Sequence, residues 1–342
     1  MDPIYSLEIA VTLFLQGLGS WLAAPMRLIS FLGQEEFYLL LMPAVYWSID
    51  TALGIRLGIM LLTAQFTNTF FKLLGQAPRP YWFDPRVQAY STETSFGLPS
   101  GHSQSSAGIF GLLAALVRRR WVTVTMLVVI FLVGVSRIYL GVHFLTDVLV
   151  GWLLGGLLVL LFARLDAPVS AWIERMSLTQ QVGLAAASSL GIVLLNMLVI
   201  AFTPSFMLPQ TWVTNSLAAA PQVTIDPFKL DGIFTIAGTW FGLLAGAAWL
   251  RKRFGKFDAG GQALHRLARY AIGAVGVFIL WYGLGAVLPR NEDILSYVLR
   301  YTRYTLIGVW ISALAPLLFV RLGISKWLTK PLESIQTAEN PI

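Results

Sequence analysis

Apolar stretches recur along the whole chain, and short polar segments separate them. Most are close to the roughly 17–25 residues that an α-helix needs to cross a bilayer. Lipid offers no partners for free backbone groups, so such segments are expected to be helical. The pattern therefore predicts an all-α, polytopic transmembrane helical bundle. The expected spans lie at about 36–49, 53–73, 103–117, 121–137, 142–163, 180–202, 232–250, 267–288 and 304–321.

The first apolar segment, residues 5–25, differs from the others because Gly17, Gly19 and Pro25 interrupt it. It is expected to form either an interfacial helix or a further span. Residues 1–26 contain no Lys or Arg, so the positively charged start of an ordinary signal peptide is missing.

Composition supports the assignment to a membrane. Of the 342 residues, 56% are hydrophobic and 12% are charged, whereas soluble domains carry roughly 25% charged residues. The chain has no cysteine, which excludes disulfides and thiolate metal sites. The net charge of +7 comes from short basic clusters between apolar segments. That arrangement indicates membrane topology rather than nucleic-acid binding.

Basic residues between the spans predict the orientation of the chain. Arginines 118–120 follow the third span and basic residues 251–253 follow the seventh, so both groups fall on one side if the spans alternate. The positive-inside rule places that side in the cytoplasm. The outer side has few basic residues, and these are expected to have a role other than topology. Most of them are Lys72, Arg79, Arg86 and Arg137.

Two of these outer cations lie at the ends of spans, and a third lies in the turn that follows one. Lys72 ends the second span, Arg137 closes the fourth, and Arg79 lies in a stiff turn between two prolines. A basic residue at a span end is often only reaching for the interface. Together at one membrane face, however, three cations suit a tetrahedral oxyanion such as phosphate.

The segment Pro99-Ser100-Gly101-His102 forms a tight turn that leads into the third span. Glycine lets the backbone approach a ligand closely. If a helix begins near Gly101, its free N–H groups point at that ligand. The imidazole of His102 is suited to protonate a leaving oxygen.

A second histidine stands four residues before a carboxylate at the start of the fifth span. His143 and Asp147 are expected to share a helix face. The carboxylate can accept the Nδ1–H of the imidazole, which leaves Nε2 free as a nucleophile.

These three segments match, in order, the three-part signature of the type 2 phosphatidic acid phosphatase superfamily, which the chain resembles over about residues 30–165. The resemblance implies a six-helix core and metal-independent hydrolysis of a phosphomonoester or diphosphate. It also implies that His143 is the nucleophile that forms a phosphohistidine, with Asp147 orienting it. His102 would be the general acid and later the base for water. The residues that would bind the phosphoryl oxygens are Lys72, Arg79, Ser100, Gly101 and Arg137.

The distribution of carboxylates supports metal independence separately. A two-metal site needs several clustered carboxylates. The outer-face segments around the motifs offer mainly Asp84, Glu93 and Asp147, and only Asp147 has a clear role in the motif. No metal and no other cofactor is therefore expected, and lysine and arginine donors are expected to stabilise the charge instead.

The two halves of the chain are predicted to differ. Residues 1–165 carry the signature and are expected to form the phosphatase core, whereas residues 166–342 add about four spans as a scaffold or substrate gate. The outward loop at 203–230 could cap the site or dip into lipid. Gly238, Gly242 and Gly246 follow one face of a helix, a spacing that permits close helix contact. Internal packing is the simpler explanation for them, and a homodimer seam is the alternative.

The leading functional hypothesis is a lipid phosphatase with its active site on the extracytoplasmic face. Cations at span ends lie near the headgroups, so a substrate could keep its tails in the bilayer. Polyprenyl diphosphate, phosphatidate, phosphatidylglycerophosphate and a sphingoid-base phosphate all fit the chemistry. One alternative is a soluble sugar-phosphate phosphatase resembling glucose-6-phosphatase. Another is a non-catalytic lipid-binding or transport protein. The expected partners are the bilayer and a membrane lipid phosphate, and no nucleic acid.

Overall fold

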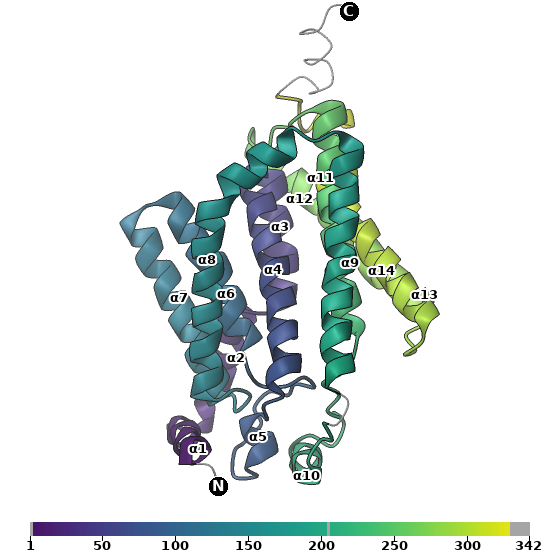
Figure 1. Cartoon of the computed structure of the whole chain (residues 1–342). Coiled ribbons are helices and arrows are strands. Elements are labelled where there is room, and N and C mark those ends of the chain that lie inside the picture. Colours follow the sequence, from purple (N-terminus) through teal and green to yellow (C-terminus); the bar gives the residue numbers. More distant parts are fainter. Residues whose placement is uncertain (1–2, 204–205, 329–342) are drawn as a thin grey trace, which may run out of the picture. The chain divides into compact units, whose positions relative to one another are not determined.

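The computed structural model describes residues 3–203 and 206–328 (Figure 1). In these ranges the regular elements are helices joined by loops, together with one isolated bridge between Phe257 and Trp327. The prediction of an all-α membrane protein is confirmed. Seven helical segments are long and apolar enough to cross a membrane, or eight if one bent pair counts as a span. The seven are Thr51–Phe83, Arg120–Tyr139, Leu145–Glu174, Leu178–Phe202, Asp231–Phe254, Ala263–Val287 and Ile294–Arg321.

Two predicted spans form helices that are shorter than these. Helix α3 (Glu35–Ser48) has 14 residues and α6 (Gly101–Val117) has 17. The first apolar segment forms α1 (Pro3–Gly17) and then η1 (Ser20–Leu22) with α2 (Ala23–Phe31), and a bend of 90° separates the two parts. Gly19, with φ at +116°, makes this bend possible because that backbone conformation suits glycine. The number of helices in the core stays a prediction.

The described chain divides into two compact units, neither of which is continuous in sequence. Unit 1 comprises Met1–Tyr38, Thr63–Leu165 and Leu195–Lys229. Unit 2 comprises Leu39–Leu62, Asp166–Leu194 and Leu230–Ile342. All the motif residues identified in the sequence belong to unit 1. The predicted division into 1–165 and 166–342 stays a prediction.

Unit 1 places three helices and several short elements around the motif segments. Helices α6 and α7 (Arg120–Tyr139) pack along each other, and α2 also packs against α7. Helix α8 (Leu145–Glu174) approaches α6 closely because glycines replace side chains at their contact. A Cβ on Gly151 would lie 2.7 Å from the carbonyl oxygen of Ser100, so only glycine fits there. This contact sets α8 directly against the turn that begins α6.

An aromatic cluster lies beside the motif segments at one end of unit 1. Trp82 belongs to α5 (Pro80–Phe83) and contacts Trp212 of α10 (Gln210–Ala219). Phe96 contacts both Phe206 and Phe228 edge-on. The loop predicted at 203–230 is thus packed against the segments between α4 and α6 in its described part. Its proposed role as a cap for the site stays a prediction.

Unit 2 is built around the close contact of α11 (Asp231–Phe254) with α14 (Ile294–Val309) and η3 (Trp310–Leu314). A Cβ on Gly238 would lie 2.4 Å from the carbonyl oxygen of Tyr301, and one on Gly242 would lie 2.1 Å from that of Thr305. Gly246 faces Ser312 in the same way. The glycine face of α11 therefore packs against α14 and η3 of the same chain. A homodimer through this face would have to displace α14, so the geometry favours internal packing.

The other helices of unit 2 complete the remaining predicted spans. The segment predicted at 267–288 forms α12 (Ala263–Phe278), the π-helical turn η2 (Ile279–Gly283) and α13 (Leu284–Val287). The last predicted span ends with α15 (Ala315–Arg321). The helices α4 (Thr51–Gly75), α8 and α9 (Leu178–Phe202) each contribute residues to both units.

Candidate active site

Arg79 is a buried side chain held by backbone and hydroxyl oxygens. It precedes the short helix α5, where Pro80 takes the first helical position. Its Nε donates to the carbonyl oxygen of Ser95 (2.6 Å), and its Nη2 donates to the carbonyl oxygen of Phe96 (3.0 Å). Its Nη1 donates to the carbonyl oxygen of Val142 (2.9 Å). This guanidinium thus joins the segment before α6 to the loop before α8.

Lys72 reaches the same oxygens as Arg79. It lies in the last turn of α4, and its Nζ donates to Ser95 Oγ (3.0 Å) and to the carbonyl oxygen of Phe96 (2.5 Å). Arg79 Nη2 also donates to Ser95 Oγ (3.1 Å). Two cations of the first motif therefore share acceptors from Ser95 and Phe96. Sequence reasoning did not identify Ser95.

The Ser100-Gly101 turn begins α6 as the sequence predicted. Ser100 is the N-cap residue, and its side chain accepts from the backbone N–H of Ser103. A Cβ on Gly101 would lie 3.0 Å from Asn68 Oδ1. Asn68 Nδ2 in turn donates to the carbonyl oxygen of Pro99 (3.1 Å) and to Gln104 Oε1 (2.9 Å). This buried network fixes the turn against α4.

His143 lies just before α8 rather than on it. The prediction that His143 and Asp147 share a helix face was wrong in this respect, because α8 begins only at Leu145. Asp147 reaches back from the first turn of the helix, where its Oδ2 accepts the backbone N–H of Phe144 (3.0 Å). This is the geometry of a capping box, in which an acidic side chain satisfies the N–H at the start of its own helix. The chain turn before His143 uses Gly141, whose φ is +76°.

The contacts of His143 define the tautomer of its ring. Nδ1 lies 3.1 Å from Asp147 Oδ2, and Nε2 lies 3.3 Å from Arg79 Nη1. A guanidinium can only donate hydrogen bonds, so Nε2 must accept and the ring proton must be on Nδ1. The carboxylate therefore holds that proton, and Nε2 presents a lone pair to the cations. His143 and Asp147 are both almost fully buried.

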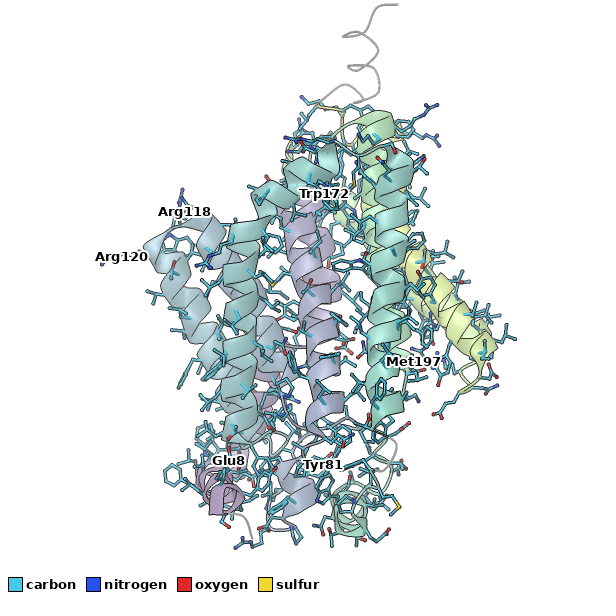
Figure 2. All side chains as sticks on the ribbon, viewed as in Figure 1. Glu8, Tyr81, Arg118, Arg120, Trp172 and Met197 are labelled. Carbon is cyan, nitrogen blue, oxygen red and sulfur yellow. The ribbon has the colours of Figure 1, made fainter. Side chains whose placement is uncertain are left out.

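Asp147 also connects the second and third motifs through its backbone. Its carbonyl oxygen accepts the N–H of Ser100 (2.9 Å). Glu8 of α1 is buried beside the start of α8, and its Oε1 accepts hydrogen bonds from the backbone N–H of Thr146 (2.6 Å) and from the Thr146 hydroxyl. Glu8 thus supports the N-terminus of α8 next to His143. Figure 2 shows Glu8 at the end of unit 1 that carries Tyr81, away from Arg118 and Arg120.

Arg137 is buried and already paired. Its Nη2 forms an ion pair with Glu93 Oε1, and its Nη1 donates to Ser30 Oγ (2.7 Å). Its Nε is buried without a partner among the described residues, and so is Nε2 of His102. Buried polar groups in proteins are normally satisfied, so two such groups indicate a place where a ligand supplies the partner. Gly33 makes room for His102, since a Cβ there would lie 3.0 Å from the His102 Cβ.

The charges of the site act on its titratable groups. Burial and then the nearby Arg79 and Lys72 hold the pKa of His143 well below its ordinary value, so the ring is neutral at neutral pH. Burial on its own would raise the pKa of Glu93, but Arg79 and Arg137 outweigh it and lower this pKa to about 2. Glu93 is therefore a carboxylate among cations. It stands where an anionic substrate would meet the same guanidinium groups.

All eight residues predicted from the sequence belong to unit 1, and hydrogen bonds or ion pairs connect six of them into two groups. Arg79, His143, Asp147, Ser100 and Lys72 form one group, and Arg137 is joined to Glu93 in the other. Gly101 and His102 follow directly after Ser100 in the first turn of α6. Sequence reasoning missed Glu8, Ser30, Glu93 and Ser95 as members of the site. A neutral, oriented imidazole facing a cluster of buried cations suits transfer of an anionic phosphoryl group.

The helices and this site define a multi-pass membrane phosphatase. Comparison with known proteins identifies its family. Residues 53–169 match the profile of the PAP2 superfamily, and residues 234–327 match that of the PAP2 superfamily phosphatase transmembrane extension. The chain belongs to the PAP2 superfamily, as the sequence motifs predicted.

Individual relatives match less than half of the chain. Phosphatidylglycerophosphatase B of Bacillus subtilis is 32% identical over 45% of this chain and 80% of its own length. Sphingosine-1-phosphate phosphatase 2 of Mus musculus is 33% identical over 38% of this chain, and the match spans 38% of that protein. The crystal structure of a transmembrane PAP2 type phosphatidylglycerolphosphate phosphatase from Bacillus subtilis is 28% identical. It covers 49% of this chain and 89% of its own, with a TM-score of 0.44.

Proposed function

We propose that this protein hydrolyses a lipid phosphate without a metal ion, through a phosphohistidine on His143. The observation that carries the proposal is the arrangement of His143 between Asp147 and Arg79, with Nδ1–H directed at the carboxylate and Nε2 directed at the guanidinium. The named activities of the Bacillus subtilis and Mus musculus relatives, both on lipid phosphates, support the choice of substrate class.

When the substrate binds, the cations of the site are expected to exchange their hydrogen-bond acceptors, and the backbone is not expected to move. Lys72 and Arg79 now donate to Ser95 and Phe96, and a phosphoryl group offers stronger, charged acceptors for the same donors. The N–H groups at the start of α6, beside Gly101, add neutral donors to the anion. Arg137, whose Nε has no partner among the described residues, completes the set.

The reaction then proceeds in two displacements. Nε2 of His143 attacks phosphorus as the bond to the lipid oxygen breaks, and His102 gives that oxygen its proton. The phosphohistidine carries positive charge on its ring, which the Asp147 carboxylate stabilises through Nδ1–H. His102 next takes a proton from water, the water oxygen attacks phosphorus, and inorganic phosphate leaves as Nε2 is restored. Arg79 must release Nε2 before the attack, which binding of the phosphoryl group achieves by occupying the guanidinium.

The test of this function is phosphate release by the purified protein in detergent with a chelator present. The panel contains polyprenyl diphosphate, phosphatidate, phosphatidylglycerophosphate, sphingosine phosphate and glucose 6-phosphate. Release from a lipid that persists in chelator supports the proposal and ranks its substrates. Release from glucose 6-phosphate alone would replace the lipid with a soluble sugar phosphate. No release from any member would favour the non-catalytic lipid-binding or transport alternative.

We also propose that the site faces the extracytoplasmic side, as the loop charges indicate. Because the chain has no cysteine, single-cysteine variants report the topology directly. Arg119→Cys, in the exposed loop between α6 and α7, should react with a membrane-impermeant maleimide only after the membrane is opened. Gln222→Cys, in the exposed part of the 203–230 loop, should react in intact cells. The reverse pattern would invert the topology and place the site in the cytoplasm.

Glu93 should compete with the substrate for Arg137. The substitution Glu93→Gln removes a negative charge from the cation cluster and keeps the shape of the side chain, so vanadate should inhibit about tenfold more strongly. The measurement is the vanadate inhibition constant, with the exposed Glu292→Gln as the matched control. Weaker inhibition in Glu93→Gln would show instead that Glu93 is needed to hold Arg137 in position.

A further inference from the structure

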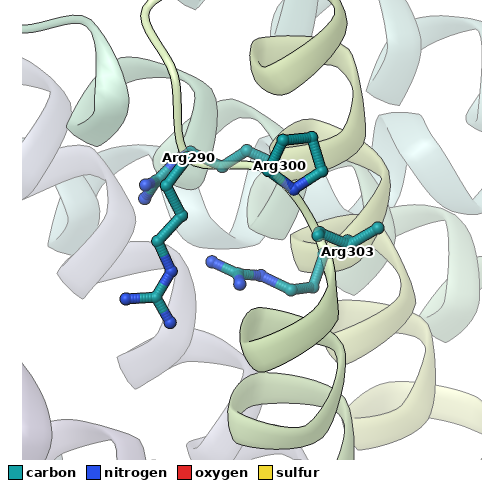
Figure 3. Close-up of a pocket in the computed structure, with 5 residues that line it drawn as sticks. Arg290, Arg300 and Arg303 are labelled. Carbon is teal, nitrogen blue, oxygen red and sulfur yellow. The ribbon is translucent and has the colours of Figure 1, made fainter.

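Three arginines meet at one end of α14 in unit 2, in the region that matches the transmembrane extension. Arg290, Arg300 and Arg303 line a hollow with Leu288 and Pro289 (Figure 3). The hollow is partly open to its surroundings. Guanidinium groups repel one another at short range, so a cluster of three needs a reason to persist.

Arg300 and Arg290 each have a partner, but they leave the cluster strongly positive. Arg300 Nη2 forms an ion pair with Asp231 Oδ2 at 2.8 Å. Arg290 donates through Nε and Nη2 to the carbonyl oxygen of Gly285 (3.0 and 2.7 Å). Among the described residues, the one carboxylate in an ion pair with any of these arginines is Asp231, which pairs with Arg300.

Arg303 is the buried member of the cluster and has no counter-ion among the described residues. Its side chain is only 8% exposed, and its Nε is buried without a hydrogen-bond partner in the described part of the chain. Its guanidinium stacks over Tyr304 at 5.0 Å. Its Nη1 occupies the space in front of Gly285, where a Cβ would lie 2.5 Å away. A buried charge without a partner is costly, so such a group is normally paired.

Another buried arginine in unit 2 shows how this fold satisfies such a group. Arg269 donates to three carbonyl oxygens, those of Ala259, Gly260 and Ile324, at 2.6–2.8 Å. Arg303 has no comparable acceptors among the described residues, although Arg290 beside it donates to the carbonyl oxygen of Gly285. Arg269 also leaves its Nε without a partner among the described residues, but both of its Nη atoms have acceptors, whereas the described residues give none to the Nη atoms of Arg303.

Membrane topology does not explain the cluster either. In unit 2, Arg251, Lys252 and Arg253 lie at the end of α11, and Arg321 lies at the end of α15. The positive-inside rule accounts for that end. The ion pair of Arg300 with Asp231, the first residue of α11, places the arginine cluster at the opposite end. Basic residues are depleted there unless they bind something.

We propose that Arg290, Arg300 and Arg303 form a second phosphate-binding site, in the transmembrane extension and separate in sequence from the catalytic motifs. Planar guanidinium groups bind phosphate oxygens in pairs, and weakly hydrated arginine is better suited than lysine to a partly buried site. A phosphate group would supply the missing counter-ion to Arg303. The group belongs either to the headgroup of an anionic lipid or to free phosphate, and the two sources are separated by experiment.

The experiment counts bound ligands on the full chain by native mass spectrometry. Protein in a neutral detergent is titrated with inorganic phosphate. In parallel, protein in phosphatidylcholine nanodiscs is titrated with phosphatidylglycerol, a phosphodiester that a phosphomonoester site does not cleave. The variants are Arg303→Met, which keeps the length of the side chain, and Arg290→Gln, which changes an exposed residue and does not threaten folding. The matched control is Arg321→Gln at the other end of the unit.

Arg303→Met and Arg290→Gln should each weaken one class of bound phosphate about tenfold or more while the control does not. The thermal midpoint of Arg303→Met without ligand should equal or exceed that of the wild type, because an unpaired buried charge has been removed. Loss confined to phosphatidylglycerol assigns the site to a lipid headgroup, and loss of inorganic phosphate assigns it to the free ion. Unchanged binding of both ligands in both variants would overturn the proposal. A lowered midpoint together with unchanged binding would instead show that Arg303 has a purely structural role.

Discussion

Replacing His143 with alanine should reduce turnover by about 10⁴-fold or more, since in the proposed mechanism this side chain makes the bond to phosphorus. The substitution should leave the protein folded. His143 lies in the loop before α8, and its ring contacts only the Asp147 carboxylate and the Arg79 guanidinium through hydrogen bonds. Asp147 keeps its bond to the N–H of Phe144 in the variant, so the start of α8 is retained.

The decisive measurement is the amount of labelled phosphate that becomes covalently bound to the protein. Wild-type protein quenched during turnover of a lipid labelled in its phosphate should carry label that is stable in base and labile in acid, as expected of a phosphohistidine. His143→Ala should carry none. His265→Ala is the matched control, because it removes the histidine that lies in neither motif, and it should turn over normally. Near-normal activity in His143→Ala, or label that remains on the protein, would exclude the proposed mechanism.

The helices could be predicted from the sequence because lipid leaves the backbone little choice. Predicted ends agree with the structure to within a few residues at α4 and α7. The larger errors have local causes. Helix α8 begins at Leu145 because the Asp147 carboxylate caps it there, and it continues to Glu174 through Pro168. The sequence pattern alone does not distinguish the lipid-buried part of a helix from its continuation beyond the membrane.

The motif residues could be identified because their chemistry is concentrated in short segments. The residues that support them could not, because their contacts are distant in sequence. Ser30 contacts Arg137 across 107 positions, and Glu8 contacts Thr146 across 138. Glu93 was visible only as an acidic residue near the outer face. No periodic pattern reports such pairs, so the role of the first two helices at the site emerged only from the structure.

The same limit applies to Arg303. In sequence it is one of several arginines in and around a predicted span, and an arginine near a span end is ordinarily explained by contact with the interface. Only the structure shows that the side chain turns inward, fills the space in front of Gly285 and finds no acceptor among the described residues. Burial together with a missing partner, rather than residue type, is what indicates a site.

Replacing Asp147 with asparagine should lower kcat by about 10²–10⁴-fold, because it removes the charge that stabilises the phosphohistidine in the proposed mechanism. Oδ2 accepts from both His143 Nδ1 and the N–H of Phe144. An amide oxygen in that position can keep both contacts, so the variant changes charge more than geometry. Gly97 lies against this oxygen, since a Cβ there would be 3.0 Å from it, and this leaves little room for the amide to rotate.

The distinction between charge and structure is made by comparing kcat with vanadate affinity. In the proposed site, Lys72, Arg79 and Arg137 are the main ligands of vanadate. The substitution leaves them in place, so the vanadate inhibition constant should change far less than kcat. Asp166→Asn, which breaks the ion pair with Arg56 in unit 2, is the matched control and should alter neither quantity strongly. If vanadate affinity fell in Asp147→Asn as much as kcat did, the carboxylate would be holding the site together. An equal loss in both quantities would therefore show that Asp147 is needed for the structure of the loop before α8 rather than for the chemistry of the imidazole ring.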